Sequence, residues 1–176
     1  ALAKAQNDLR KYFGLLLKSN GSMPQVYAVK PGSSADRAGI KKDDIVIAIW
    51  GRLTGYMSIK EVVNYFLERA SREVRCTIER TITVPVSSGT GLFSGAKNLI
   101  GADLKMEVDG LTISKLQCDG AALEAGLRQR DQVVAINGNP TRYMPLKKAI
   151  DMIRNSPGSV KITVRRDAIV WKSDNE

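Results

Sequence analysis

Two glycines, Gly14 and Gly101, are the residues whose type and spacing point most directly to chemistry. Each lies inside an apolar run, "KYFGLLLKS" or "NLIGADLK", that otherwise has the pattern of a β-strand. A glycine there loses backbone entropy and adds no side chain to a core, so it needs another reason to be present. Because the two glycines occupy the same register of a duplicated segment, the pattern indicates a role for the backbone.

Side-chain chemistry is sparse by comparison. The 176 residues include no histidine, which removes the commonest general base and the commonest metal ligand. No serine lies in a nucleophile elbow, and neither Cys76 nor Cys118 has an imidazole partner or a metal-ligand neighbour. Both cysteines lie in apolar surroundings and are expected to be free buried thiols, which favours a reducing compartment. We therefore expect no enzyme activity, no metal and no cofactor.

The chain is an internal repeat. The segment "SSADRAGIKKDDIVIAIWGRLTGYMSIKEVV" aligns with "GAALEAGLRQRDQVVAINGNPTRYMPLKKAI" at a spacing of 87 residues, the interval between Gly39 and Gly126. Gly14 and Gly101 keep the same interval. The repeat predicts two domains, 1–80 and 81–176, in which residues 81–98 supply a first strand and a Ser/Gly-rich loop to the second domain.

Each copy predicts the same series of elements. A strand follows the glycine, a second strand follows a turn, a short helix ends at a glycine, another strand alternates, and a longer helix precedes a closing strand. This series indicates a β-rich α+β fold with one short and one longer helix in each domain. The expected strands after the glycine are 15–18 and 102–106, the second strands are 25–29 and 111–116, and the longer helices are 58–69 and 145–155.

This ordered set of features, present twice, resembles the PDZ domain. The matching segments are the glycine step before a strand, "PGSSADRAGI" and "DDIVIAIWG" in the first copy, and "DGAALEAGLRQRDQVVAING" in the second. The short join through "ERTITV" resembles the paired domains of the syntenin and Mint-type adaptors. The resemblance covers nearly the whole chain, and it implies two partly open β-barrel or sandwich domains that bind the C-terminal tails of partner proteins.

The resemblance also implies a function for the glycines. In PDZ domains the glycine loop turns successive backbone N–H groups toward the terminal carboxylate of a bound peptide. The implied loops are Phe13, Gly14 and Leu15 in the first copy, and Ile100, Gly101 and Ala102 in the second. The alternative is that each glycine is only a bulge at the start of a strand.

A bound peptide would add as an extra strand beside 15–18 or 102–106, with alternate side chains in a pocket under the longer helix. Many PDZ domains begin this helix with a histidine that binds Ser or Thr at the third-last ligand residue, but here Ile59 and Leu146 occupy that position. We therefore expect apolar ligand residues at the last and third-last positions; the alternative is that the helix residues are ordinary core. The implied pocket residues are Phe13, Leu15, Leu17, Ile59, Val63 and Phe66, and in the second copy Ile100, Ala102, Leu104, Leu146, Ile150 and Ile153.

The net charge of +9 favours anionic partners. Basic residues near the glycine loops and on predicted turns or helix faces are candidate sites for a carboxylate or for phosphoinositide headgroups, which some PDZ domains bind. The alternative is a solvated basic face. Nucleic acid is not expected, because no aromatic platform accompanies the basic residues. The candidates are Arg10, Lys11, Lys97, Arg128, Arg130, Lys147 and Lys148.

The sequence thus favours a non-catalytic adaptor that holds the C-terminal tails of partners, including membrane proteins, in the cytoplasm or at the membrane periphery. One alternative is a phosphoinositide-directed tandem with degenerate grooves. Another is the regulatory part of an HtrA-like bacterial envelope protease. A third is a homodimer in which one C-terminus occupies another chain's groove, but Glu176 fits an apolar pocket poorly.

Overall fold

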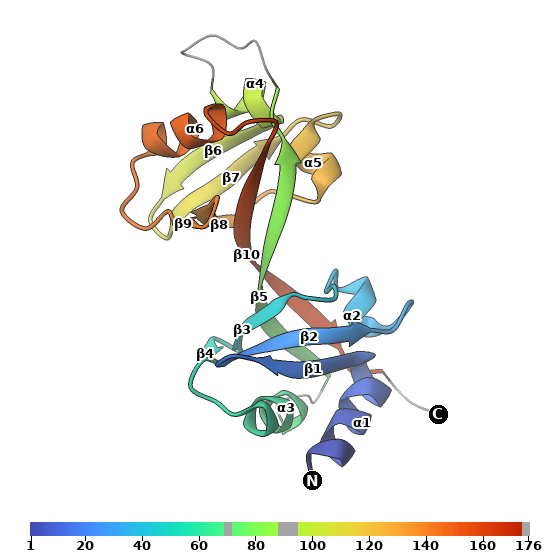
Figure 1. Ribbon diagram of the computed structural model, residues 1–176. Coiled ribbons are helices and arrows are strands. Elements are labelled where there is room, and N and C mark those ends of the chain that lie inside the picture. Colours follow the sequence, from blue (N-terminus) through green and yellow to red (C-terminus); the bar gives the residue numbers. More distant parts are fainter. Residues whose placement is uncertain (69–71, 88–94, 174–176) are drawn as a thin grey trace. The chain divides into compact units, whose positions relative to one another are not determined.

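The computed structural model describes residues 1–68, 72–87 and 95–173 (Figure 1). The chain divides into two compact units, which we call unit 1 (Ala1–Arg80 and Asp167–Glu176) and unit 2 (Thr81–Arg166). The β-rich α+β class expected from the sequence is confirmed. Most of the expected Ser/Gly-rich loop, residues 88–94, lies outside the described residues. No helix in the described residues has both the length and the apolarity needed to cross a membrane.

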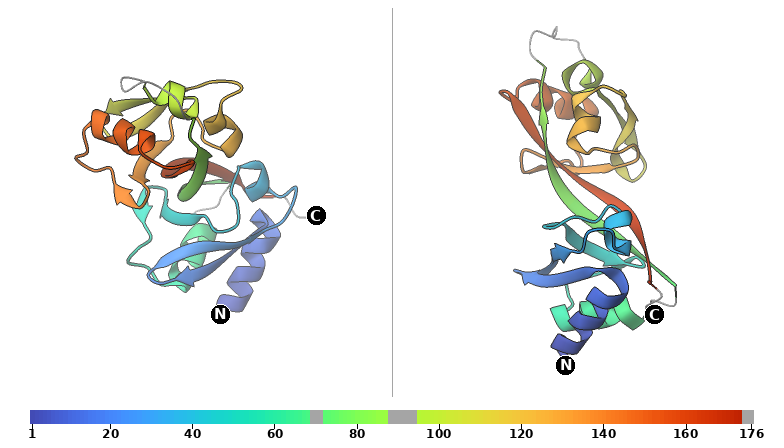
Figure 2. Two further views of the ribbon diagram at one scale, coloured as in Figure 1. Left: turned by 45° about the horizontal axis from the view of Figure 1, so that its top comes forward. Right: turned by 90° about the vertical axis from the view of Figure 1, so that its right-hand side faces the viewer.

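Unit 1 is built on a sheet with three helices. Its elements are α1 (Leu2–Phe13), β1 (Leu15–Asn20), β2 (Met23–Val29), α2 (Ser34–Arg37), β3 (Ile45–Ile49), β4 (Arg52–Leu53), α3 (Ile59–Glu68) and the first part of β5 (Glu73–Pro85). The strand order is β1-β2-β3-β5, which leaves β1 at an edge. Helices α1 and α3 lie against each other at this β1 edge (Figures 1 and 2). One hydrophobic cluster joins α1, α3 and the sheet.

Unit 2 repeats the plan with a shorter first helix. Its elements are α4 (Ala96–Ile100), β6 (Ala102–Glu107), β7 (Gly110–Leu116), α5 (Ala121–Ala125), β8 (Gln132–Ile136), β9 (Asn139–Pro140), α6 (Leu146–Arg154) and the first part of β10 (Ser159–Trp171). The strand order β10-β8-β7-β6 leaves β6 at an edge, as β1 is in unit 1. A second hydrophobic cluster joins α4, α6 and these strands.

Strands β5 and β10 pair with each other, and each contributes to both units. After leaving unit 1, β5 places Ile82 and Val84 in the core of unit 2. After leaving unit 2, β10 places Ala168 and Val170 in the core of unit 1. The domain boundaries expected from the sequence therefore differ from the structure at the end of β10, where residues 167–173 belong to unit 1.

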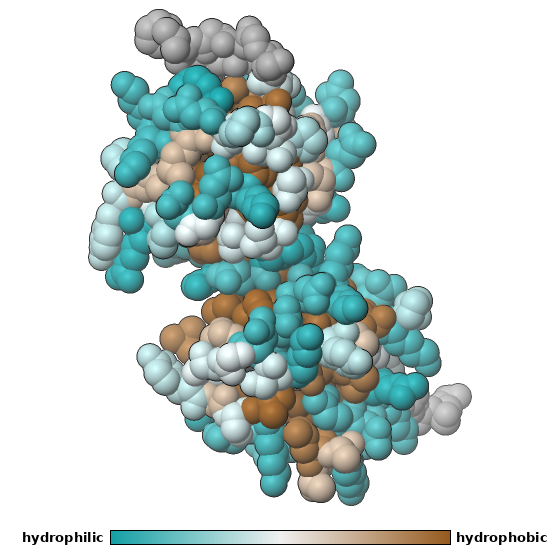
Figure 3. All heavy atoms as spheres, in the orientation of Figure 1, coloured by the Kyte–Doolittle hydropathy of each residue, from teal (hydrophilic) through white to brown (hydrophobic). Residues whose placement is uncertain are grey.

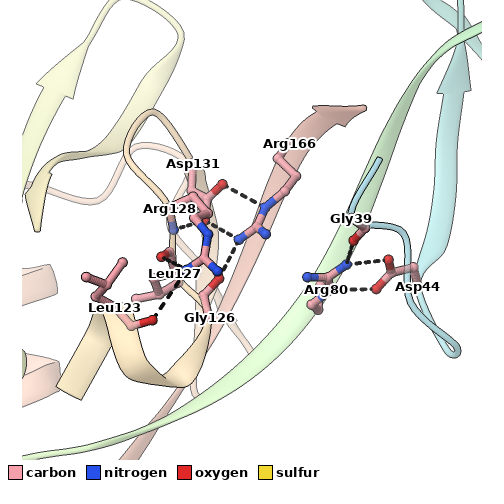
Figure 4. A network of polar contacts seen from close by, with 9 residues as sticks. All are labelled: Gly39, Asp44, Arg80, Leu123, Gly126, Leu127, Arg128, Asp131 and Arg166. Carbon is pink, nitrogen blue, oxygen red and sulfur yellow. Dashed lines mark hydrogen bonds and ion pairs between the residues drawn. The ribbon is translucent and has the colours of Figure 1, made fainter. Parts of the chain in front are cut away.

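A buried ion pair is repeated in the two units (Figure 4). In unit 1, Arg80 Nε and Nη2 donate to the Asp44 carboxylate at 2.7 and 2.6 Å, and Nη2 also donates to the Gly39 carbonyl. In unit 2, Arg166 makes the same bonds to Asp131, at 2.9 and 2.5 Å, and to Gly126. Two parallel bonds to a carboxylate are strong and fix orientation. Each pair thus ties a long strand to the loop after the short helix.

The residues 11–13, expected in a strand, form the last turn of α1 instead. Ala5, Leu9 and Phe13 are buried at helical spacing, and Gly14 ends the helix in the left-handed conformation with φ 75°. The hydrophobic contacts of a helix face therefore prevail over the strand-like composition. The prediction of two buried thiols is correct for Cys76 but wrong for Cys118, which is exposed in a turn before α5.

Candidate functional site

The two glycines lie at the C-terminal ends of helices α1 and α4, and not within a strand or a bulge. Gly14 has φ 75° and Gly101 has φ 76°, a conformation that glycine adopts at little cost. The N–H of Gly14 donates to the Arg10 carbonyl at 2.9 Å, and that of Gly101 donates to the Lys97 carbonyl at 3.0 Å. The expectation that both glycine amides are available to a carboxylate is therefore wrong, because each amide completes its own helix.

Close packing is a second reason for glycine at these positions. A Cβ on Gly14 would lie 2.1 Å from the Ser33 Cβ, and one on Gly101 would lie 2.8 Å from the Gly120 Cα. Both distances are far below van der Waals contact. Only a residue without a side chain allows the helix end and the neighbouring loop to approach this closely.

The donor available to a ligand belongs to the residue after each glycine. The carbonyl of Gly14 accepts from Lys30 N–H, and Leu15 then faces Val29 in the antiparallel ladder. Bonded and non-bonded pairs alternate in such a ladder, so the N–H of Leu15 points away from β2 to the outer edge.

The same register recurs in unit 2. The carbonyl of Gly101 accepts from Gln117 N–H, and Ala102 faces Leu116. The N–H of Ala102, and two residues later that of Leu104, therefore point away from β7. Since β6 is an edge strand, these groups are the pairing edge that an added peptide strand uses.

In unit 1 that edge is occupied by the chain's own helix α1. The Gln6 side chain donates from Nε2 to the Leu17 carbonyl at 2.6 Å and accepts from the Leu17 N–H at 3.3 Å. Leu9, on the same helix, is completely buried. Helix α1 thus lies where a peptide would add to β1.

The predicted pocket of unit 1 is assembled, but it is filled. Phe13 meets Phe66 edge-to-face with ring centroids 4.8 Å apart, and both rings are fully buried. Leu17 is 3% exposed and Val63 is 0% exposed. Gly14 and Leu15 are buried as well, and only Ile59 retains partial exposure. The residues predicted for peptide binding in unit 1 therefore serve as core beneath α1.

The residues predicted for the pocket of unit 2 belong to one hydrophobic cluster, and some of them retain accessible surface. Ile100, Ala102 and Ile153 are buried. Leu104, Leu146 and Ile150 are half-buried on β6 and α6. Leu104 and Ile150 are the repeat equivalents of Leu17 and Val63, which α1 covers completely in unit 1.

The difference between the units has a basis in the sequence. At the repeat interval, the position of Gln6 corresponds to Phe93, which lies outside the described residues. A phenyl ring has no amide with which to satisfy both main-chain groups of Leu104. The sequence therefore has no counterpart of Gln6 at the repeat position in unit 2.

The basic candidates fall into different settings. Lys97 is exposed and, with Lys115, borders a cleft of about 170 Å³ beside Gly101 and Ala102. Arg10, Lys11 and Lys30 border an open cleft of about 470 Å³ beside Gly14.

The remaining candidates lie in unit 2. Arg128 donates from Nη1 to the carbonyl oxygens of Leu123 and Leu127, so its guanidinium is partly engaged within the loop (Figure 4). Arg130 is exposed in a turn, and Lys147 and Lys148 are exposed on the first turn of α6. Figure 3 shows hydrophilic and apolar side chains interspersed over the visible face of each unit.

Gln6 and the helix that carries it were not among the predicted features. The signal was the recurrence of Leu2, Ala5, Leu9 and Phe13 at intervals of three and four residues, which is typical of one helix face. Helix α1 would have been predicted from that interval, but the bonds of Gln6 depend on tertiary packing.

Comparison with known proteins identifies the same family in both units. The PDZ domain family matches residues 92–165, and a second PDZ domain family matches residues 25–80. PDZ domains are non-catalytic interaction modules. A solved structure of a choanoflagellate SHANK1 PDZ domain bound to a GIRK3 peptide is 20% identical, with a TM-score of 0.43, and covers 51% of this chain and 93% of that one.

Two curated relatives are bacterial proteases. A probable periplasmic serine protease do/HhoA-like of Haemophilus influenzae is 25% identical over 175 residues, covering 90% of this chain and 36% of that protein. The periplasmic serine endoprotease DegP of Salmonella typhimurium is 25% identical over 156 residues, covering 80% of this chain and 31% of that protein. The chain therefore spans about a third of the length of these relatives.

Proposed function

Because the chain contains two PDZ domains in tandem, we propose that it is a non-catalytic adaptor that binds one C-terminal tail peptide in the groove of unit 2. The observation that carries the proposal is the contrast between equivalent residues. Leu17 and Val63 are covered by α1, whereas Leu104 and Ile150 retain exposed surface beside an edge strand. Binding one tail per chain replaces the expectation of two.

The peptide adds antiparallel to β6, with its terminal carboxylate at Ala102 N–H. Lys97 and Lys115 border the adjoining cleft and attract the carboxylate. The last side chain enters the pocket over Ile100 and Ile153, and the third-last lies against Leu146 and Ile150. No group on these side chains bonds a hydroxyl, so apolar ligand residues are favoured at both positions.

The test compares two tail peptides that differ only at the end, a free carboxylate in one and an amide in the other. We expect calorimetry to show about one site per chain and about tenfold weaker binding of the amide, because charge-assisted bonds to the carboxylate are lost. Leu104→Asp should abolish binding, while Lys105→Asp on the opposite face of β6 should not. Equal binding of both peptides, or unchanged binding by Leu104→Asp, would contradict the proposal.

The curated relatives bear on the kind of protein in which the tandem would bind tails. We infer that the tandem is a tail-binding part of a longer bacterial envelope protein of the protease type. What supports this is that both curated relatives are periplasmic proteases of which the chain covers about a third. The test is the sequence of the complete gene product, which we expect to contain a protease domain before Ala1. A complete product without a protease domain would contradict this inference.

A lipid-directed function remains a second proposal. Lys147 and Lys148 are exposed next to each other at the start of α6, and the described residues of unit 1 present a separate basic cleft around Arg10 and Lys30. Each cation near an anionic surface contributes roughly 1 kcal/mol. Sedimentation with neutral and phosphoinositide-containing vesicles at low salt tests it, and equal binding to the two would eliminate it.

A further inference from the structure

The sheet of unit 1 has one face turned away from its core, formed by β3, β5 and β10. Buried and accessible residues alternate along β5 and β10, and the buried ones in unit 1 belong to its hydrophobic cluster. Ile169 and Trp171 of β10 are among the accessible residues and are 41% and 57% exposed. Because successive side chains of a strand point to opposite faces, both lie on the face away from the core. Two large apolar side chains therefore meet solvent there.

Two hydrogen bonds fix the register of β10 on β5 in unit 1. Thr77 Oγ1 donates to the Asp167 carboxylate at 2.8 Å, and the N–H of Lys172 donates to the Arg72 carbonyl at 2.6 Å. Both bonds fit one antiparallel register. In that register the opposite pairs on the face away from the core are Arg75 with Ile169 and Glu73 with Trp171.

Two more exposed apolar residues adjoin these pairs. The N–H of Trp50 donates to the Arg75 carbonyl at 2.8 Å, so Trp50 lies next to Arg75, and its side chain is 42% exposed. Leu53 is 59% exposed and lies opposite Ala48, which in turn lies opposite Thr77. Exposed apolar residues that gather in this way mark an interaction site. We call this surface the outer face of unit 1, and it consists of Trp50, Leu53, Glu73, Arg75, Ile169 and Trp171.

Unit 2 builds the same face from mainly polar residues. The hydroxyls of Thr81 and Thr163 lie 2.9 Å apart in a hydrogen bond that sets the equivalent strand register. Asn137 occupies the position of Trp50, and its N–H donates to the Lys161 carbonyl at 2.8 Å. The fold therefore does not require apolar side chains on this face. The exposed residues of unit 2 that correspond to Leu53, Ile169 and Trp171 are Pro140, Thr83 and Pro85.

The outer face of unit 1 is complementary to the same face of a second copy. A twofold axis that runs across the strands, between the two opposite pairs, exchanges the pair Arg75 and Ile169 with the pair Glu73 and Trp171. The guanidinium of one copy then faces the Glu73 carboxylate of the other, and Ile169 faces the indole of Trp171. A twofold interface makes each of these contacts twice. Because opposite charges meet and apolar groups meet, a second copy matches this face.

We propose that two copies of the chain associate through the outer face of unit 1, in an aligned sheet-on-sheet contact. The residues of this face belong to unit 1 and include none from the proposed groove of unit 2. The inference therefore stands apart from the proposed tail binding. The contact is small, so we expect a Kd on the order of 10–100 µM and a monomer in dilute solution.

Sedimentation equilibrium of the 176-residue chain at about 0.15 M salt tests the proposal, since salt of this strength screens the repulsion between two copies of net charge +9. We expect the mean mass to rise from one chain toward two between about 1 and 500 µM. Ile169→Lys should weaken association at least tenfold, because it places a second cation beside Arg75 in an apolar contact. Thr83→Lys adds the same charge at the equivalent position of unit 2 and should leave association unchanged.

Two milder changes keep the fold while altering the contact. Ile169→Thr gives unit 1 the residue that unit 2 has at this place, and it should weaken association about three- to tenfold through lost apolar burial. Arg75→Glu brings its new carboxylate against Glu73 of the second copy and should weaken association about tenfold. Adding Glu73→Arg to Arg75→Glu restores opposite charges and should recover the wild-type association, which a purely structural role of Arg75 would not allow.

Several results would overturn the proposal. They are a chain that stays monomeric up to about 500 µM, a dimer that survives Ile169→Lys, and equal weakening by Ile169→Lys and Thr83→Lys. An excess of tail peptide should leave the dimer in place, because β6 takes no part in it. Dissociation by the peptide would instead indicate that one copy's C-terminus occupies the groove of another. A dimer that binds no tail peptide contradicts the proposed function alone.

Discussion

The side-chain amide of Gln6 satisfies both main-chain groups of Leu17, donating to its carbonyl oxygen and accepting from its N–H. These are the two bonds that a paired residue of an added strand would make. A single glutamine on α1 therefore imitates a ligand, and the edge of β1 is protected by the chain itself. Uncovered edges of this kind are prone to pair with other chains.

Replacing Gln6 by alanine should expose this edge. We expect Gln6→Ala to lower the free energy of unfolding by about 1 kcal/mol, because a half-buried pair of hydrogen bonds is lost. The Leu17 amide should exchange its hydrogen faster in NMR measurements, while amides of unit 2 keep their rates. Asn7→Ala is the matched control, since Asn7 is the next residue of α1 and is exposed. An unchanged exchange rate at Leu17 would show that the Gln6 bond does not protect the edge.

The crossing of β10 makes unit 1 depend on residues that follow unit 2. Val170 is fully buried in the core of unit 1, and Ile169 beside it is 41% exposed. Val170→Ala should destabilise unit 1 by about 1–3 kcal/mol through lost burial and the cavity left behind. Ile169→Ala should change its stability little, because its side chain points outward.

Tryptophan fluorescence can follow this loss selectively. The chain has two tryptophans, and both Trp50 and Trp171 belong to unit 1. Urea denaturation monitored by their emission should therefore shift its midpoint for Val170→Ala. If Val170→Ala and Ile169→Ala shift the midpoint equally, residues 167–173 do not complete the core of unit 1.

The sequence permits prediction of whatever depends on local spacing. The interval between Gly39 and Gly126 reveals the duplication, and alternation in "ERTITV" predicts that the strand after Arg80 continues. It does not reveal which core receives a buried strand residue, because Val164 and Ala168 follow the same alternation yet enter different units. That choice depends on long-range packing.

As with the fold, only the part of the candidate site that depends on local spacing was predictable. The strands and helices that carry the predicted pocket residues were expected from their strong periodicity, and they form in both units. The closure of one pocket was not predictable, because it rests on one polar residue, Gln6, reaching across to a strand.

Removing one partner of the repeated ion pair should strongly reduce folding stability. Asp131 is 1% exposed and is bonded by both Arg166 and the N–H of Arg128. Arg166→Ala leaves a buried carboxylate without its cation, and we expect a loss of about 3–5 kcal/mol of folding stability. Calorimetric unfolding measures it.

The surface pair of Lys105 and Glu107 supplies the control for that measurement. Its atoms lie 3.6 Å apart and both side chains are largely exposed. Lys105→Ala should produce no measurable change, because solvent screens such pairs. Comparable melting temperatures for Arg166→Ala and Lys105→Ala would show that the buried pair is not needed for the fold.

The two thiols should differ sharply in reactivity. Burial raises the pKa of Cys76 from 9.0 to about 12, with the nearby carboxylates of Asp167 and Asp44 adding to the effect. Cys118 is exposed. A thiol reagent at pH 8 should therefore modify one cysteine per native chain, and Cys118→Ser should abolish that reaction. Two equally fast thiols would contradict the burial of Cys76.

The raised pKa also has a consequence for stability. An unfolded chain ionises Cys76 near pH 9, while the folded chain keeps it protonated to about pH 12. The contribution of Cys76 is therefore fully present below pH 9 and is lost as the pH rises from 9 to 12. Cys76→Ala should show less loss of stability over that pH range than the wild-type chain.

The choice of the third-last ligand residue follows from the first turn of α6. In the proposed groove, Leu146 and Ile150 offer no partner to a hydroxyl, so burying a Ser or Thr against them without a bond would cost about 1–3 kcal/mol. A library of C-terminal peptides should therefore yield Val, Ile or Leu at that position. Leu146→His introduces a hydrogen-bonding side chain and should shift the selection toward Ser and Thr. Leu53→His, in unit 1 and 59% exposed, should not shift it. Selection of Ser or Thr by the wild-type chain would refute this account of the groove.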